Sequence, residues 1–132
     1  ASEGRCRQRY ADGGGHRLVV GAVPYKPSTD DSGSIMVLLV NSSKYPDEWV
    51  LPKGGWELGE TAEAGAARES WEEAGCEGSV LSPLVESQLV LGGKETQLHT
   101  YFAMEISGLP DDWPEGNLRQ RKLVTVSDAL DI

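Results

Sequence analysis

The stretch GGWELGETAEAGAARESWEEAGC, residues 54–76, predicts the central helix of the fold. Thr61 is a suitable N-terminal cap, alanine is frequent after it, and Gly75 stands where helices commonly end. We therefore expect a helix over residues 61–75, preceded by a turn at the Gly-Gly pair. The strands predicted on either side of this helix then determine the class of the fold.

The carboxylates at the end of this helix gather on one side of it. At about 100° per residue, Glu69, Glu72 and Glu73 share one side, and the other carries Glu63, Ala67, Ser70, Trp71 and Ala74. The simplest interpretation is an amphipathic helix that packs its Ala and Trp side chains against a sheet. On that interpretation, the three carboxylates lie in water.

The same three carboxylates also indicate a metal site. Glu69 lies one turn from both Glu72 and Glu73, and each such like-charge pair costs about 0.2 to 0.5 kcal/mol. All three lie near the helix C-terminus, where the macrodipole disfavours an anion by about 0.3 to 1 kcal/mol. Arg68 is the one cation of this helix, so we expect a hard divalent ion, Mg²⁺ or Mn²⁺, to relieve the repulsion.

Strand patterns flank the helix on both sides. Residues 17–23 and 35–40 are apolar runs that we expect to pair as a hairpin with a long loop. The other predicted elements are a short strand at 49–52 ended by Pro52, a hairpin of 80–92 with 96–106 around Gly92-Gly93, a strand at 121–126, and a helix capped by Ser127. Strands around one long helix predict an α/β or α+β layered domain rather than a barrel or a bundle.

The length of the chain is that of one domain. We expect all 132 residues to form it, with residues 1–15 as a partly flexible arm and the last helix cut short. The longest apolar run, residues 35–40, is too short to cross a bilayer. The spacing of Cys6 and Cys76 does not call for a disulfide. We expect a cytoplasmic monomer, with a nuclear location and a processed, secreted form left open because the chain begins at Ala1.

The charge distribution limits the class of ligand. A net charge of -9 argues against general nucleic-acid binding and against binding to anionic membranes. Residues 57–77 contain seven acidic residues and one arginine, whereas basic residues gather toward both ends. Such a distribution suits metal ions together with a small polyanion, although solvated surface charges would look similar.

The quoted stretch resembles the Nudix box, G-x5-E-x7-R-E-U-x-E-E-x-G-U, where U is aliphatic. The seven fixed positions are filled by Gly54, Glu60, Arg68, Glu69, Glu72, Glu73 and Gly75. Ser70 and Cys76 replace the two aliphatic residues, and we expect both to be buried without loss of chemistry. The resemblance implies an αβα sandwich around a mixed β-sheet.

Family resemblance also implies a reaction and its residues. The reaction is metal-dependent hydrolysis of a phosphoanhydride, for which positioning and charge neutralisation supply most of the rate. Glu69 and Glu73 would bind Mg²⁺ or Mn²⁺, with the carbonyl of Gly55 as a candidate third ligand and that of Gly54 as the alternative. Glu72 would bind a second ion or orient the attacking water, and Arg68 would hold the carboxylates in place through Glu60 or Glu72.

Within the family, the run SSKYPDEWVLPKGGWELGE, residues 42–60, most resembles the diphosphoinositol polyphosphate phosphohydrolases, which also cleave diadenosine polyphosphates. The diadenosine tetraphosphate hydrolases share parts of it. The resemblance and the basic residues predict phosphate-binding groups at Arg9, Arg17, Ser42, Ser43, Lys44, Lys53, His99, Arg119 and Arg121. For each of them a solvated side chain, or a satisfied core histidine at His99, is the alternative.

The sequence is therefore consistent with three functions. The leading one is hydrolysis of inositol pyrophosphates, because basic residues are many and base-stacking platforms are few. The second is hydrolysis of diadenosine polyphosphates, for which Trp56 could stack on a base. The third is a noncatalytic module that binds a phosphorylated ligand, which the intact set of carboxylates disfavours.

Overall fold

The computed structural model describes residues 7–11, 15–30, 33–92 and 95–131. It contains, in chain order, β1 (Arg17–Pro27), β2 (Ile35–Asn41), β3 (Trp49–Val50), β4 (Lys53–Gly55), α1 (Ala62–Ala74), β5 (Glu77–Gly92), β6 (Glu95–Gly108), β7 (Arg121–Thr125) and α2 (Val126–Leu130). Part of the predicted arm (residues 1–6 and 12–14), Cys6, Gly93 and the terminal Ile132 lie outside the described residues.

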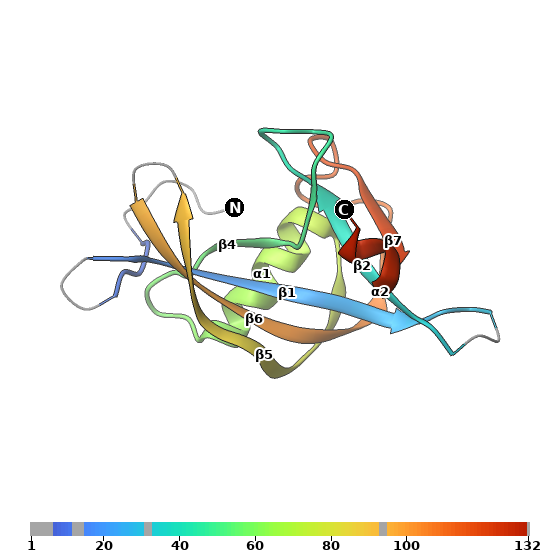
Figure 1. Ribbon diagram of the computed structural model, residues 1–132, viewed down its shortest axis with the longest axis horizontal. Coiled ribbons are helices and arrows are strands. Elements are labelled where there is room, and N and C mark those ends of the chain that lie inside the picture. The colour runs from blue at the N-terminus through green and yellow to red at the C-terminus, as the bar shows by residue number, and fades with distance from the viewer. Residues whose placement is uncertain (1–6, 12–14, 31–32, 93–94, 132) are drawn as a thin grey trace.

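The strands form one mixed sheet in the order β3-β2-β1-β6-β5, with β4 paired to β1 and β7 paired to β2. Only β1 and β6 run parallel among the pairs described. Helix α1 lies behind β1 and β6 in the view of Figure 1, and α2 lies beside β2 and β7. The predicted fold class, a layered α+β domain around a mixed sheet, is confirmed.

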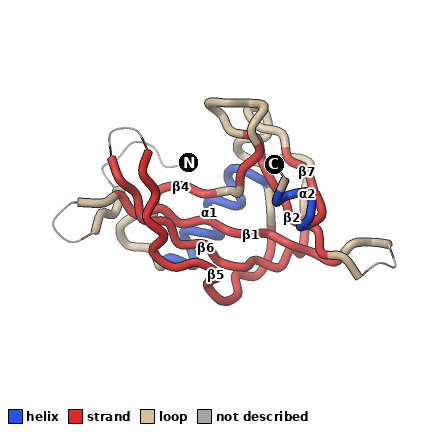
Figure 2. The backbone as a smooth tube through the Cα atoms, in the orientation of Figure 1, coloured by secondary structure: helices blue, strands red, loops and turns tan. Residues whose placement is uncertain are grey.

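Most of the predicted elements are present with small changes in their limits. The two long hairpins, β1 with β2 and β5 with β6, pair antiparallel as expected. Figure 2 shows how far the strands of the β5–β6 hairpin extend. None of the described helices is long and apolar enough to span a membrane.

Two expectations about the chain near the helices were wrong. The Gly-Gly pair is part of strand β4, where Gly55 and Gly54 stand opposite Val19 and Val20 of β1. Helix α2 is capped by Thr125, whose hydroxyl accepts from the N–H of Asp128, and not by Ser127. Thr125 is the cap because its hydroxyl provides an acceptor for an amide in the first turn, which would otherwise lack one within the helix.

The core lies where α1 meets the sheet. It is built from Ala22, Leu38, Val40, Ala74, Cys76 and Met104. Cys76, which replaces an aliphatic residue of the motif, is a free thiol buried in this core, and Ser70 is fully buried as well. Both atypical residues are therefore buried, as expected.

Candidate active site

The buried face of α1 carries two carboxylates together with the predicted Ala74, and the predicted Trp71 lies outside it. Glu69 is 0% exposed and Glu73 is 4% exposed, whereas Trp71 is 36% exposed. The amphipathic interpretation, with Trp71 inside and the carboxylates in water, was therefore wrong. Small residues explain the orientation, because a Cβ at Gly65 would lie 2.8 Å from a methyl group of Val20 on β1. Large side chains on this face would prevent such close packing.

Glu69 is held beside the backbone of β4. Its Oε2 accepts a 2.7 Å hydrogen bond from Arg68, while its buried Oε1 has no hydrogen-bond partner. Burial raises the pKa of Glu69, and the hydrogen bond from Arg68 opposes this shift. A Cβ at Gly54 would lie 2.3 Å from the Glu69 carboxylate, so only glycine fits there.

Glu73 lies one helical turn further on. Its Oε1 accepts from the backbone N–H of Lys53 at 3.0 Å, and its Oε2 accepts from Arg119 at 3.4 Å. Burial raises the pKa of Glu73 to about 7, although the charge of Arg119 opposes the shift. The fold thus places two carboxylates in a desolvated region, where both oxygens of Glu73 have donors and Oε1 of Glu69 has none.

Arg68 connects the helix to the loop before it. Its guanidinium donates to both oxygens of Glu60, to the carbonyl of Gly55 at 2.9 Å, and to Glu69 and Glu72. Burial would lower the pKa of Arg68, but the hydrogen bonds to Glu60 and Glu69 raise it. The predicted pairing of Arg68 with Glu60 and Glu72 is confirmed, and Gly55 presents its carbonyl to the same guanidinium.

Glu60, the predicted partner of Arg68, is held by hydrogen bonds from both sides. Burial would raise its pKa, but hydrogen bonds from Arg68 and from the N–H of Glu57 lower it. A charged Glu60 therefore anchors Arg68. Its place in the motif, eight residues before Arg68, is the signal that identified this pairing in the sequence.

The donor set suits a hard divalent cation. Within the described part of the chain, no three His, Cys, Asp or Glu side chains form a group that could hold a metal ion. Glu72 instead directs Oε2 to Arg68 at 3.3 Å. Glu69 and Glu73 share the buried face, and the unpartnered Oε1 of Glu69 is the kind of hard oxygen that Mg²⁺ prefers. The residues present therefore fit a divalent cation at Glu69 and Glu73.

Arg119 is the predicted basic residue that lies directly at this site. It donates to Glu73, to Glu115 at 2.8 Å and to the carbonyl of Asn41 at 2.9 Å. A cavity of about 490 Å³ lies beside it, between residues 41–47 and 116–120. The loop before β7 therefore holds the guanidinium of Arg119 beside the carboxylate of Glu73.

Arg121 has a different place from the one predicted. Its guanidinium donates to four carbonyls, those of Ala74, Gly75, Leu109 and Pro110, and lies 4.1 Å from the ring centroid of Trp113. Arg121 thus anchors the C-terminus of α1 to the loop that follows β6. The structure does not bring it into the site, and we withdraw it as a phosphate-binding group.

The remaining basic candidates fall into two groups. Arg9 stacks on Trp56 with 4.6 Å to the ring centroid, and Arg17 donates to Gln8 at 2.9 Å, so both are built into the N-terminal edge of the site. The loop residues Ser42, Ser43 and Lys44 follow Asn41, and Lys44 lies 5.5 Å over Tyr45. Ser43 and Lys44 are exposed and follow the strand that Arg119 contacts.

Trp56 and His99 both have partners within the protein. Trp56 donates its indole N–H to the carbonyl of Glu60, and Arg9 covers its ring. His99 is 4% exposed, and both of its ring nitrogens lie near polar partners, Tyr101 and Gln97. His99 therefore matches the alternative reading of a satisfied core histidine, and its neighbours Gln97 and Tyr101 were not foreseen.

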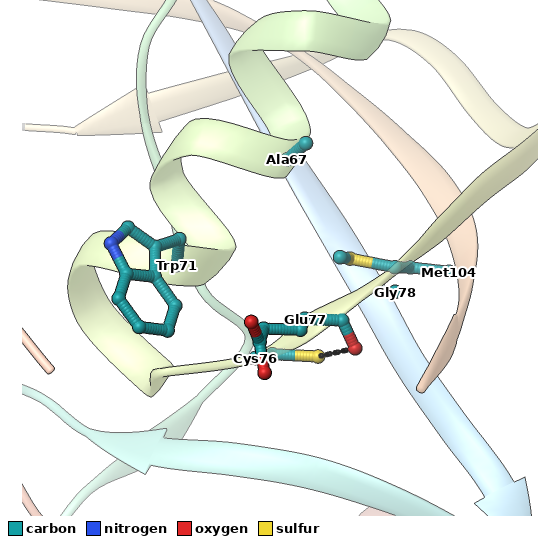
Figure 3. Close-up of a pocket in the computed structure, with 6 residues that line it drawn as sticks. All are labelled: Ala67, Trp71, Cys76, Glu77, Gly78 and Met104. Atoms are coloured by element: carbon teal, nitrogen blue, oxygen red, sulfur yellow. Dashed lines mark hydrogen bonds between the residues drawn. The ribbon is translucent and has the colours of Figure 1, made fainter. Parts of the chain in front are cut away.

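A second hollow lies on the exposed side of α1. Figure 3 shows this cavity of about 300 Å³, lined by Ala67, Trp71, Cys76, Glu77, Gly78 and Met104. Neither Glu69 nor Glu73 lines it. The cavity is therefore separate from the carboxylates on the buried face.

Comparisons with known proteins agree with this geometry. The chain is 40% identical over 131 residues to Nudix hydrolase 21, chloroplastic, of Arabidopsis thaliana, covering 98% of this chain and 65% of that protein. It is 37% identical over 101 residues to diphosphoinositol polyphosphate phosphohydrolase 2 of Rattus norvegicus, covering 73% of this chain and 53% of that protein. A solved C. elegans Ap4A hydrolase binary complex matches with a TM-score of 0.70 and 26% identity, over 87% of this chain and 84% of that one.

The family model described as the NUDIX domain matches residues 15–132, which include the carboxylate helix and the loops that hold it. Hydrolases of this family generally use a divalent metal such as Mg²⁺. With this match over most of its length, the chain belongs to the NUDIX domain family of hydrolases.

Proposed function

We propose that this chain hydrolyses the phosphoanhydride bond of a small-molecule polyphosphate with the help of Mg²⁺ or Mn²⁺. The observation that carries the proposal is the burial of Glu69 and Glu73 on one face of α1, with Oε1 of Glu69 left without a hydrogen-bond partner. Burying carboxylates is costly unless a cation or hydrogen bonds offset it. A site for a divalent cation accounts for their retention.

Each residue of the site would have its own role in this hydrolysis. Glu69 and Glu73 would hold the cation, with the Gly55 carbonyl as a further ligand and Glu72 as a second-ion ligand or the group that orients the attacking water. A bound divalent cation would neutralise phosphate oxygens and lower the pKa of water. Arg68 positions the carboxylates, and Arg119, fixed by Glu115 and Asn41, would bind phosphate oxygens.

Two substrate classes remain as proposals. Similarity to the rat phosphohydrolase and the candidates Arg9, Arg17, Ser42, Ser43, Lys44, Lys53 and Arg119 support an inositol pyrophosphate. Likeness to the C. elegans Ap4A hydrolase supports a diadenosine polyphosphate. The internal bonds of Arg121 remove one of the cations on which the preference for inositol pyrophosphate rested. A monomeric state and a cytoplasmic location also stay predictions.

Phosphate release under matched conditions tests the function. With Mg²⁺ present, we expect turnover of a diphosphoinositol pentakisphosphate or of diadenosine tetraphosphate, and loss of that turnover when EDTA is added. Comparison of kcat/KM for the two compounds ranks the substrate classes. Tight binding of either compound with no turnover under Mg²⁺ or Mn²⁺ would instead support a noncatalytic binding module.

Gly54→Ala tests the contact between β4 and Glu69. The new Cβ would lie 2.3 Å from the carboxylate, so Glu69 or the strand must move. Because a misplacement of about 1 Å can cost about 10²-fold in rate, we expect kcat/KM to fall by about that factor. Gly15→Ala is the matched control, because its Cβ would meet nothing within 4 Å. Unchanged kinetics in Gly54→Ala would contradict the placement of Glu69.

A further inference from the structure

A row of polar side chains runs along one face of β6. On β6, Gln97, His99 and Tyr101 alternate with Leu98 and Thr100, so they share one face of the sheet. Their partners on the parallel strand β1 are Arg17, Val19 and Gly21. Figure 1 shows β6 running alongside β1. This face is therefore polar along the strand that neighbours β1.

Tyr101 ends this row at the carboxylate site. A Cβ at Gly21 would lie 2.8 Å from Tyr101 Cε1 and 2.8 Å from Lys53 Cβ, so the two side chains border the same space above Gly21. The N–H of the same Lys53 donates to Glu73. Burial, followed by the nearby Glu73 charge, raises the pKa of Tyr101 to about 12. The phenol therefore keeps its proton at neutral pH.

His99 is neutral and has one N–H to give. Burial, followed by the charges of Lys53 and Arg17, lowers the pKa of His99 to about 4. Its Nε2 lies 2.7 Å from the carboxamide oxygen of Gln97, which can only accept, so Nε2 carries the proton. Nδ1 is then an acceptor, and the hydroxyl of Tyr101, 3.1 Å away, donates to it. The single phenol proton is thus directed to the imidazole.

We propose that Gln97 and His99 are positioning residues that make the Tyr101 oxygen a hydrogen-bond acceptor for the substrate. This inference rests on the proposed function, because it concerns the ligand of the same site. Phosphate oxygens lack protons at neutral pH and would find no donor at Tyr101. The oxygen selects a hydroxyl or amine on the group that carries the phosphates. A diadenosine polyphosphate has both groups and a diphosphoinositol pentakisphosphate has neither, so Tyr101 is a specificity-determining residue that favours the first of these substrates.

The tautomer of His99 can be measured without any substrate. In nitrogen-15 NMR spectra of the whole chain at pH 7, we expect a protonated Nε2 and an unprotonated Nδ1 on His99. Gln97→Leu removes the acceptor and should weaken this preference, whereas Gln97→Glu retains an acceptor and should keep it. A protonated Nδ1 in the unmodified chain would overturn the proposal, whatever the enzyme hydrolyses.

Kinetics with sugar-modified compounds test the selection itself. For diadenosine tetraphosphate, Tyr101→Phe should raise KM about 3- to 10-fold, which is the value of one hydrogen bond, and leave kcat nearly unchanged. The analogue with 2′,3′-dideoxyriboses tests for a hydroxyl donor, and diinosine tetraphosphate tests for an amine donor. One of the two analogues should bind Tyr101→Phe and the unmodified chain with the same KM.

The controls separate this proposal from the proposed function. Tyr25→Phe removes a phenol oxygen from the far end of β1 and should leave every KM unchanged. If Tyr101→Phe lowers affinity equally for all three compounds, or for none, the selection is refuted. If no compound is hydrolysed, equilibrium binding of the same three compounds replaces KM, and the proposed function fails independently of the Tyr101 result.

Discussion

Glu73→Gln and Glu69→Gln are each expected to reduce phosphoanhydride hydrolysis on the order of 10³-fold, because each removes a ligand whose charge contributes several kcal/mol to catalysis. Glutamine has nearly the same shape, so the helix should keep its packing. In both variants, kcat should fall at saturating Mg²⁺. The measurement is steady-state phosphate release from the compound that the unmodified chain turns over.

A control on the same helix makes this result specific. Glu63 lies in the first turn of α1 and is exposed, away from the buried face. Glu63→Gln removes one negative charge from the same helix and should leave kcat and KM within about twofold of the original values, as for most surface changes. Equal losses in all three variants would mean that net charge, and not the buried pair, determines the rate.

Stability should change in the opposite direction to activity. Without metal, the folded-state pKa of Glu73 is raised from 4.5 to about 7, so the native state binds this proton more tightly than the unfolded chain does. The stability that the protonated form provides is present below pH 4.5 and is lost as the pH rises to about 7. At pH 8 the ionised Glu73 therefore lowers the free energy of unfolding by on the order of 3 kcal/mol.

Glu73→Gln should therefore stabilise the metal-free protein at pH 8 by up to roughly 10 °C in Tm. The difference in Tm between the variant and the unmodified chain should shrink as the pH falls and vanish near pH 4.5, where Glu73 is protonated in the folded state. Thermal unfolding in EDTA, recorded between pH 4.5 and pH 8 for both chains, measures it. A destabilised variant at pH 8 would mean that the bonds from Lys53 and Arg119 outweigh the cost of burial.

Local hydrogen bonds explain which parts of the fold were predictable. The limits of α1 follow from Thr61, whose hydroxyl accepts from the N–H of Ala64, and from Gly75, whose φ of 61° lies in the left-handed region. Apolar runs likewise predicted β1 and β2. Both kinds of signal are short range, so they can be read directly from the sequence.

The orientation of α1 could not be predicted from hydrophobic periodicity. That rule places apolar residues inside, and this helix buries Glu69 and Glu73 while Trp71 remains partly exposed. A functional site reverses the rule because its charges need shielding from water to bind a cation and phosphates strongly. The charge pattern, through the repulsion between the carboxylates, was the more informative signal.

The roles of the basic residues depended on distant partners. Arg121 donates to carbonyls of α1 and of the loop that follows β6, which nothing near it in the sequence indicates. In contrast, the alternation of Gln97, His99 and Tyr101 has the period of a strand and could have been recognised as one polar face. Tyr101 belongs to this face with His99, and its side chain borders the space above Gly21 together with that of Lys53.

The central claim is that a divalent cation binds to Glu69 and Glu73 when a polyphosphate is present. Carbon-13 NMR of glutamate side-chain carboxyls, recorded during a Mg²⁺ titration with methylenediphosphonate as the ligand, tests it most directly. The account predicts that the signals of Glu69 and Glu73 shift and saturate together while the signal of Glu63 stays in place. If the signals of Glu69 and Glu73 remain unchanged at saturating Mg²⁺ and ligand, the account is contradicted.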